Sequence, residues 1–250
     1  MTQQRQTRVT PTALTGSNNV SGMASFYTES KNLDGPFKTL LESLPDLNGK
    51  TVAITGCTSG TGLVLAKVAA KKGATIFCLN RPSSRAEAAV KELSDGGAKA
   101  VHIDCDLTSL ESVKAAAVSV KSKLGGGKDG LDVLCCNAGV MHLRDEPTAD
   151  KYDPQMQVNQ ISHFMLISDL WDDLSKAAEL RGDARVCMHS SIARNIDGQV
   201  GLSMGPCFPT RCVKRLDAKY FEKHEAGQLG GEGCPCILMY VVVSPPPSPP

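Results

Sequence analysis

The fold is decided by one stretch of sequence, Thr51 to Gly62, which reads TVAITGCTSGTG. Its first five residues are rich in β-branched side chains and predict a short buried strand. The glycines that follow predict a sharp turn, and apolar spacing from Gly62 to Lys72 predicts a helix. This order brings free N–H groups and the positive end of a helix dipole to one place, which suits a pyrophosphate. We therefore expect nucleotide contacts from Thr55, Gly56, Thr58, Ser59, Gly60, Thr61 and Gly62.

The same alternation of strand and helix continues along the chain. The expected strands are apolar without a clear inward and outward alternation, which indicates a buried parallel sheet with helices on both faces. Right-handed crossovers then give an α/β, doubly wound parallel sheet of the Rossmann type. The further strands are expected at 74–79, 98–103, 131–136 and 185–189, and the further helices at 35–44, 83–93, 109–124, 153–180 and 213–224.

Charge and hydropathy exclude two classes of partner. The 250 residues hold 27 basic and 26 acidic side chains, and no basic block stands out, so we expect no nucleic-acid partner. No apolar run approaches the roughly 20 residues that span a bilayer. We therefore expect no transmembrane segment.

The ten cysteines indicate a reducing compartment. Six of them lie in or beside predicted strands and are expected to be small buried hydrophobes. The other four follow no common zinc spacing and have no histidine at ligand distance, so no metal is expected. These four are Cys207, Cys212, Cys234 and Cys236.

Composition divides the chain into three parts. Residues 1–48 are rich in hydroxyl and amide side chains and are expected to be a flexible extension. Residues 49–233 form the expected nucleotide-binding domain, and residues 234–250 form a Pro-rich tail. The acid-poor start also resembles an organelle transit peptide, so a plastid or another organelle is the alternative to a cytoplasmic location.

Five motifs in order resemble the short-chain dehydrogenase/reductase family. The turn has the family's TGxxxGxG spacing, and Asp106-Leu107, Asn137-Ala138-Gly139, Asn159 and Ser190-Ser191 follow where the family has further motifs. The segment 216–233, LDAKYFEKHEAGQLGGEG, is similar to retinol-dehydrogenase-like and protochlorophyllide-reductase-like members.

The resemblance implies an oxidoreductase that moves a hydride between a nicotinamide nucleotide and a small carbonyl or alcohol. It implies that Asp106 and Leu107 lie at the adenine, and that Asn137, Ala138 and Gly139 line the cofactor site. It also implies catalytic roles for Ser191 and Asn159. Members of the family often form homodimers through helices, and the helix that begins at Asp153 is a candidate for this contact.

The end of the second strand, Leu79-Asn80-Arg81, favours NADP(H) over NAD(H). An acidic residue there would accept hydrogen bonds from the ribose 2′-hydroxyl, whereas an arginine pairs with a 2′-phosphate. We expect Arg81 to make that contact, with Asn80, Ser83 or Arg85 as helpers. A solvated surface arginine is the alternative.

The sequence departs from the family after Ser191. The family's chemistry needs a Tyr-x-x-x-Lys pair, and none follows Ser191: Tyr220 is followed four residues later by His224. Residues 234–250 resemble nothing in the family, which suggests an altered or truncated C-terminus that lacks the last helix and strands. Three hypotheses stay open: an active NADP(H) oxidoreductase, which the missing pair would impair, a nucleotide-binding protein without turnover, and an incomplete product that folds poorly. His189, two residues before Ser191, is the substitute general acid that we consider.

Overall fold

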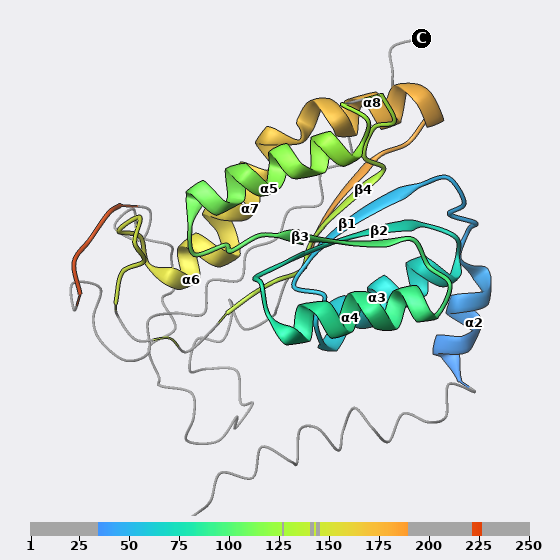
Figure 1. Ribbon diagram of the computed structural model, residues 1–250, viewed down its shortest axis with the longest axis horizontal. Coiled ribbons are helices and arrows are strands. Elements are labelled where there is room, and N and C mark those ends of the chain that lie inside the picture. Colours follow the sequence, from blue (N-terminus) through green and yellow to red (C-terminus); the bar gives the residue numbers. More distant parts are fainter. Residues whose placement is uncertain (1–34, 127, 141–142, 144–145, 190–221, 227–250) are drawn as a thin grey trace, which may run out of the picture. The chain divides into compact units, whose positions relative to one another are not determined.

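The computed structural model describes residues 35–126, 128–140, 143, 146–189 and 222–226. A five-stranded parallel sheet, ordered β3-β2-β1-β4-β5, lies at its centre (Figure 1). This order confirms the predicted α/β, doubly wound sheet, because the chain reverses direction across the sheet between β3 and β4. The strands are β1 (Thr51–Thr55), β2 (Thr75–Asn80), β3 (Ala100–Asp104), β4 (Val133–Cys136) and β5 (Arg185–Met188).

Helices cover both faces of the sheet. Figure 1 shows α3 and α4 on one face, and α5, α7 and α8 on the other. The bounds in this unit are α3 (Gly60–Lys71), α4 (Ser84–Asp95), α5 (Leu110–Lys123), α6 (Pro154–Met156), η1 (Gln157–Ile161), α7 (Ser162–Asp169) and α8 (Trp171–Arg181). The helix α2 (Pro36–Ser43) belongs to a separate unit, residues 1–44, and begins with a proline in its first turn.

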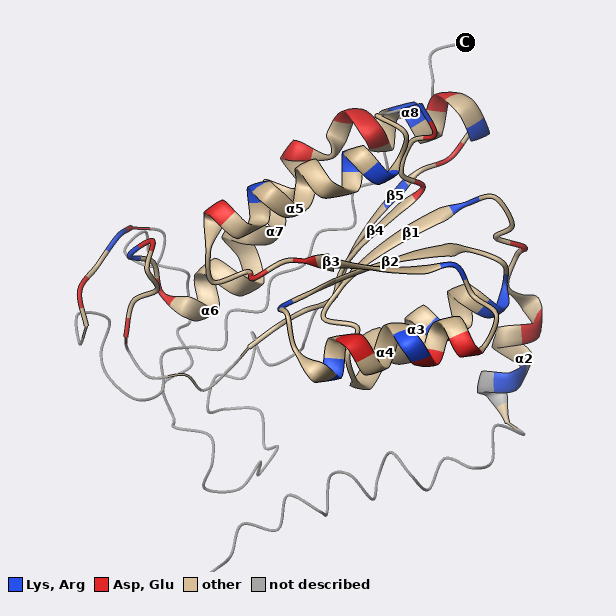
Figure 2. Ribbon diagram, in the orientation of Figure 1, with Lys and Arg blue, Asp and Glu red and all other residues tan. Residues whose placement is uncertain are grey.

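Two apolar layers hold the sheet between the helices. One layer packs Val52, Ile54 and Ile76 against α3, and the other packs Leu134 and Ile103 against α5 and α7. Charged residues of both signs lie mainly on the outward faces of the helices (Figure 2). Among the described residues, no helix has the length and apolar character needed to cross a membrane.

The prediction of one continuous helix at 153–180 is wrong, because this helix is interrupted. The structure divides it into α6, the π-helix η1, α7 and α8, with a break at Leu170, whose backbone has φ −103° and ψ 9°. The loop before β4 packs against α8 just beyond this break, where the Asp173 carbonyl accepts the Leu131 N–H at 2.8 Å. That buried N–H needs an acceptor, and the first turn of α8 supplies it.

The predicted helix at 213–224 is wrong over the three residues that the structure describes. Residues 222–224 are not helical, because the His224 N–H donates to the Lys151 carbonyl and Glu225 pairs with the Lys151 ammonium. The remainder of that helix and the Pro-rich tail lie outside the described residues.

The prediction of six buried cysteines holds for five. Cys187 is exposed, because β5 is the last strand on its side of the described sheet and buries only Val186 fully. The five buried cysteines are Cys57, Cys78, Cys105, Cys135 and Cys136.

Candidate functional site

The carboxyl ends of the parallel strands meet at one edge of the sheet, and the Gly-rich turn lies at its centre, between β1 and α3. Gly56 has a φ of +69°, and a Cβ there would lie 2.9 Å from Ala138. A Cβ on Gly62 would clash with the Asn137 side chain and with the Gly56 carbonyl oxygen. Only glycine allows these two close approaches, which press the turn against the segment after β4.

The turn leaves its outer surface open. Gly60 has a φ of +56°, and a Cβ there would meet no atom of the described residues within 4 Å. Ser59, the N-cap of α3, makes no capping hydrogen bond with its side chain. Among the described residues, the first N–H groups of α3 therefore have no side-chain cap, and a pyrophosphate could accept their hydrogen bonds.

Thr55 and Asn137 hold the turn from below. The buried Thr55 hydroxyl oxygen accepts the N–H groups of Asn137 and Ala138, both at 3.0 Å. In return, the Asn137 amide nitrogen donates to the carbonyls of Thr55 and Gly56 at 3.0 and 3.1 Å. These two residues position the backbone that faces the nucleotide.

Asn137 also joins the turn to α3 and to the end of β5. Its amide oxygen accepts the Thr61 hydroxyl at 3.1 Å. The same oxygen lies 2.9 Å from the His189 Nδ1. His189 is exposed and follows the last residue of β5.

His163 is a buried member of this network, and the sequence analysis did not single it out. Its Nε2 lies 2.9 Å from the Thr55 hydroxyl oxygen, and its Nδ1 lies 3.3 Å from the Asn159 carbonyl oxygen. Because the Thr55 oxygen already accepts two N–H groups, the hydroxyl donates to Nε2, and Nδ1 carries the proton of a neutral ring. Burial lowers the pKa of His163 to about 4. A histidine four residues after Asn159 on a helix was the only available signal.

Asn159 lies in η1, a π-helix of a kind that is rare and often found at functional sites. Its side chain pairs with the backbone of Val140: Oδ1 accepts the N–H at 2.8 Å, and Nδ2 donates to the carbonyl at 2.9 Å. Asn159 therefore fixes the segment after Gly139. Gly139 itself is exposed.

The Asp106-Leu107 motif follows the carboxyl end of β3, at the same edge of the sheet as the Gly-rich turn. The Asp106 carboxylate accepts the N–H and hydroxyl of Thr108 at 2.9 and 2.7 Å. The Leu107 carbonyl accepts the hydroxyl of Ser162 at 2.7 Å, a contact that the sequence did not suggest. The only signal of this contact in the sequence was Ser162 itself, a small polar residue next to the apolar positions of α7.

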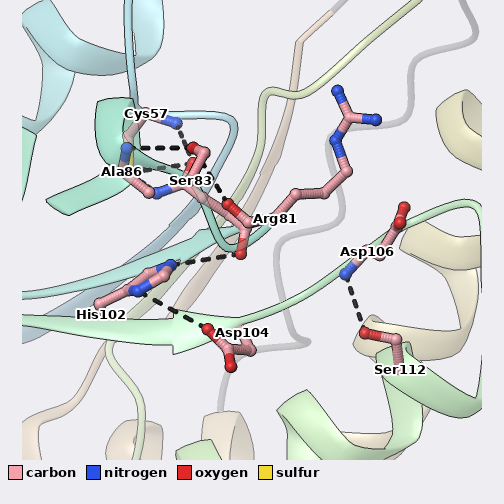
Figure 3. A network of polar contacts seen from close by, with 9 residues as sticks. Cys57, Arg81, Ser83, Ala86, His102, Asp104, Asp106 and Ser112 are labelled. Atoms are coloured by element: carbon pink, nitrogen blue, oxygen red, sulfur yellow. Dashed lines mark hydrogen bonds and ion pairs between the residues drawn. The ribbon is translucent and has the colours of Figure 1, made fainter.

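The end of β2 places Asn80 and Arg81 differently. Asn80 is buried, and its amide oxygen accepts the Cys57 N–H at 2.9 Å, so it ties β2 to the Gly-rich turn. Arg81 is exposed, and Figure 3 shows its side chain extended from the end of β2. Its guanidinium makes no hydrogen bond or ion pair with the residues that the structure describes.

Ser83 and His102 make contacts on either side of Arg81 in the chain or the sheet. Ser83 caps α4 by accepting the Ala86 N–H at 3.2 Å. On β3, the His102 Nε2 lies 3.3 Å from the Asn80 carbonyl oxygen, and its Nδ1 lies 3.6 Å from the Asp104 carboxylate (Figure 3). The Ser83 cap follows Arg81, and the His102 contact with the Asn80 carbonyl precedes it.

Several predicted residues fall outside the described part of the chain. Ser190 and Ser191 are among them, as are Tyr220 and the four downstream cysteines. Within the described residues, no group of three His, Cys, Asp or Glu side chains could hold a metal ion.

Comparison with known proteins agrees with this geometry. Residues 50–199 match the short chain dehydrogenase family. An uncharacterized oxidoreductase of Schizosaccharomyces pombe is 33% identical over 179 residues, which are 70% of this chain and 51% of that protein. Human retinol dehydrogenase 11 is 30% identical over 201 residues, which are 76% of this chain and 60% of the human protein.

A solved structure shows the same fold. It is the Pseudomonas aeruginosa RhlG/NADP active-site complex, which is 26% identical, has a TM-score of 0.51, and covers 60% of this chain and 57% of that one. The chain spans about half the length of the fission yeast relative and 60% of the human one. The family match, the ordered motifs and the sheet topology together place the chain in the short-chain dehydrogenase/reductase family, in its retinol-dehydrogenase-like branch.

Proposed function

We propose that the turn after β1 binds the pyrophosphate of NADP(H) and that Arg81 pairs with its 2′-phosphate. The observation that supports this most is the open turn, in which a Cβ on Gly60 would meet no described residue while Gly56 and Gly62 press the backbone onto the Asn137 segment. The exposed Arg81 guanidinium suits the 2′-phosphate. The relative from Pseudomonas aeruginosa was solved with NADP, which favours the same cofactor.

The proposed reaction is hydride transfer to or from a small carbonyl or alcohol. The nicotinamide ring, when bound, supplies or accepts the hydride. Asn159 would hold the backbone after Gly139 beside the reacting atoms, and Ser191 would donate a hydrogen bond to the substrate oxygen. Because no Tyr-x-x-x-Lys pair follows Ser191 in these 250 residues, we propose that turnover of this chain is impaired.

The alternative is nucleotide binding without turnover. His189 favours some residual activity, because it is exposed beside Asn137 and an imidazole can act as a general acid. The Asn159 pairing with Val140 would be kept in either case, since it is a structural contact.

Two measurements test the proposal. Titration of the purified chain with NADPH and NADH should show tighter binding of NADPH, and equal affinities would contradict the role of Arg81. An assay of NADPH oxidation against ketones, aldehydes and quinones should then give less than about 1 s⁻¹, the lower end of usual enzyme turnover. Turnover above that value would contradict the proposed impairment.

A homodimer through α5 and α7 is proposed as the assembly. Val118 on α5 is 67% exposed and Phe164 on α7 is 65% exposed, and the two helices contact each other. Exposed apolar side chains of this size favour an interface. Light scattering should give twice the mass of the chain, and the double variant Val118→Glu/Phe164→Glu should give a monomer; an unmutated monomer would contradict the proposal.

A further inference from the structure

Cys135 and Cys187 are neighbours on β4 and β5. They are partners in the parallel register of these strands. Adjacent strands lie about 4.8 Å apart, which falls within the Cα–Cα range of about 4.4–6.8 Å that a disulfide requires. The two thiols also interact, since each shifts the pKa of the other. Joining the two sulfurs would therefore need little movement of the backbone.

One of the two thiols can be reached from solvent. Cys187 is exposed, whereas Cys135 is 5% exposed. A pocket of about 310 Å³ lies over both, with Thr61 and Leu65 of α3 on one side and His189 on another. A small oxidant can enter this pocket and meet Cys187 first.

The electrostatics assign different roles to the two sulfurs. The hydrogen bond from Cys135 lowers the pKa of Cys187 to about 7, against the effect of burial, and the Arg185 guanidinium adds to this lowering. The same hydrogen bond, together with burial, raises the pKa of Cys135. Since the thiolate is the reactive form, Cys187 is the nucleophile and Cys135 is the resolving thiol.

We propose that Cys187 and Cys135 form a peroxide-responsive dithiol site. The Cys187 thiolate attacks one oxygen of a hydroperoxide, the O–O bond breaks, and the leaving oxygen departs as hydroxide (or alkoxide) and takes up a proton. Cys187 is then a sulfenic acid. The Cys135 sulfur attacks the Cys187 sulfur, the S–O bond breaks, and the S–H proton leaves with that oxygen as water. Two thiols lose two electrons, and the peroxide is reduced to two molecules of water or to water and an alcohol.

A second thiol pair provides an internal comparison. Cys57 and Cys78 also shift each other's pKa, but both are 0% exposed. Their contact resembles that of Cys135 and Cys187 without the route to solvent. We therefore expect peroxide to leave this pair reduced under conditions that oxidise Cys187.

The experiment treats the reduced, purified 250-residue chain with hydrogen peroxide and maps its thiols by mass spectrometry after tryptic digestion. The expected product is a link between peptides 129–144 and 186–194, with the loss of two hydrogens, that disappears on reduction. Cys187 should also react with a thiol-alkylating reagent at pH 7 at least about tenfold faster than Cys57. A link from Cys187 to any other cysteine, or none in a folded chain, would overturn the proposal.

Three variants assign the steps. Cys187→Ser should abolish the link, and Cys135→Ser should leave a Cys187 sulfenic acid that dimedone captures. Should Cys135→Ser fail to fold, Cys135→Ala provides the same test. Cys136→Ser is the matched control, because this neighbouring cysteine points to the opposite face of the sheet. Loss of the link in Cys136→Ser, or an unchanged link in Cys187→Ser, would contradict the assigned pair.

Discussion

The turns after β1 and after β2 reach the same edge of the sheet but are built in opposite ways. After β1, the Thr55 side chain is turned inward and bonds to Asn137 in the segment after β4, and the backbone around Ser59 and Gly60 is exposed. After β2, the Asn80 side chain is buried and the Arg81 side chain is displayed. One turn offers backbone N–H groups, and the other offers a guanidinium.

The difference separates affinity for the dinucleotide from preference for NADP(H) over NAD(H). Exposed backbone N–H groups can bind the pyrophosphate of either dinucleotide, whereas an exposed arginine binds only the one that carries a 2′-phosphate. The two turns are also connected, because Asn80 accepts the Cys57 N–H and the Leu79 carbonyl accepts the Gly56 N–H. Changes to the first turn should therefore affect both cofactors, and changes to Arg81 only one.

The largest effect is expected from Gly60→Val. A branched side chain at the open face of the turn would occupy the space of the pyrophosphate, so binding of NADPH and NADH should both be lost. Gly97→Val is the matched control, because Gly97 also has a positive φ, +84°, and open space around it. Isothermal titration should show binding in the control and none in Gly60→Val; unchanged affinity in a folded Gly60→Val would remove the turn from the site.

Thr55→Val tests the support beneath the turn. It keeps the shape of the side chain but removes the acceptor of two N–H groups, at a cost of about 2–5 kcal/mol in the free energy of unfolding. Urea unfolding followed by circular dichroism measures this loss. Thr61→Val should cost less than about 1 kcal/mol, because its exposed hydroxyl makes one bond. Equal losses in the two variants would show that the buried network does not support the turn.

His163 should make stability depend on pH in a defined window. Its pKa is lowered from 6.5 to about 4 in the folded chain, so the unfolded state binds the proton more readily. The contribution to stability is complete above pH 6.5 and falls as the pH drops toward 4, by on the order of 3 kcal/mol. Urea midpoints measured across this window should fall less steeply in His163→Gln, and parallel curves would contradict the neutral buried ring.

The smallest effect is expected from Arg81→Ala, which tests most directly the difference between the turns after β1 and after β2. NADPH affinity should fall by about 10- to 100-fold, as for a lost charge-assisted contact, while NADH affinity stays within twofold or so. Lys99→Ala is the control, since it removes an exposed positive charge before β3, at the other end of the sheet. A similar loss in both variants would indicate general charge attraction and not recognition by Arg81.

Much of the frame could be predicted because its signals are local. The apolar run from Thr51 to Thr55 and the glycines that follow specify a strand and a turn within a dozen residues, and the other strands repeat the pattern. The break in the 153–180 helix at Leu170 could not be predicted in this way, because apolar periodicity does not report contacts such as that between the nearby Asp173 carbonyl and Leu131, some forty residues earlier. Likewise, only the order of strands shows that Cys187 lies at an open side of the described sheet.

The sequence by itself determined the α/β class, the position of the Gly-rich turn and the presence of an arginine at the end of β2. The tertiary structure decided what these residues do: Asn80 supports the turn through Cys57, Asn159 holds Val140, and His163 links η1 to Thr55. The reason is that periodicity and glycine placement act over a few residues. A hydrogen bond such as that between Asn137 and Thr55 joins residues 82 positions apart, and only packing brings its donor and acceptor together.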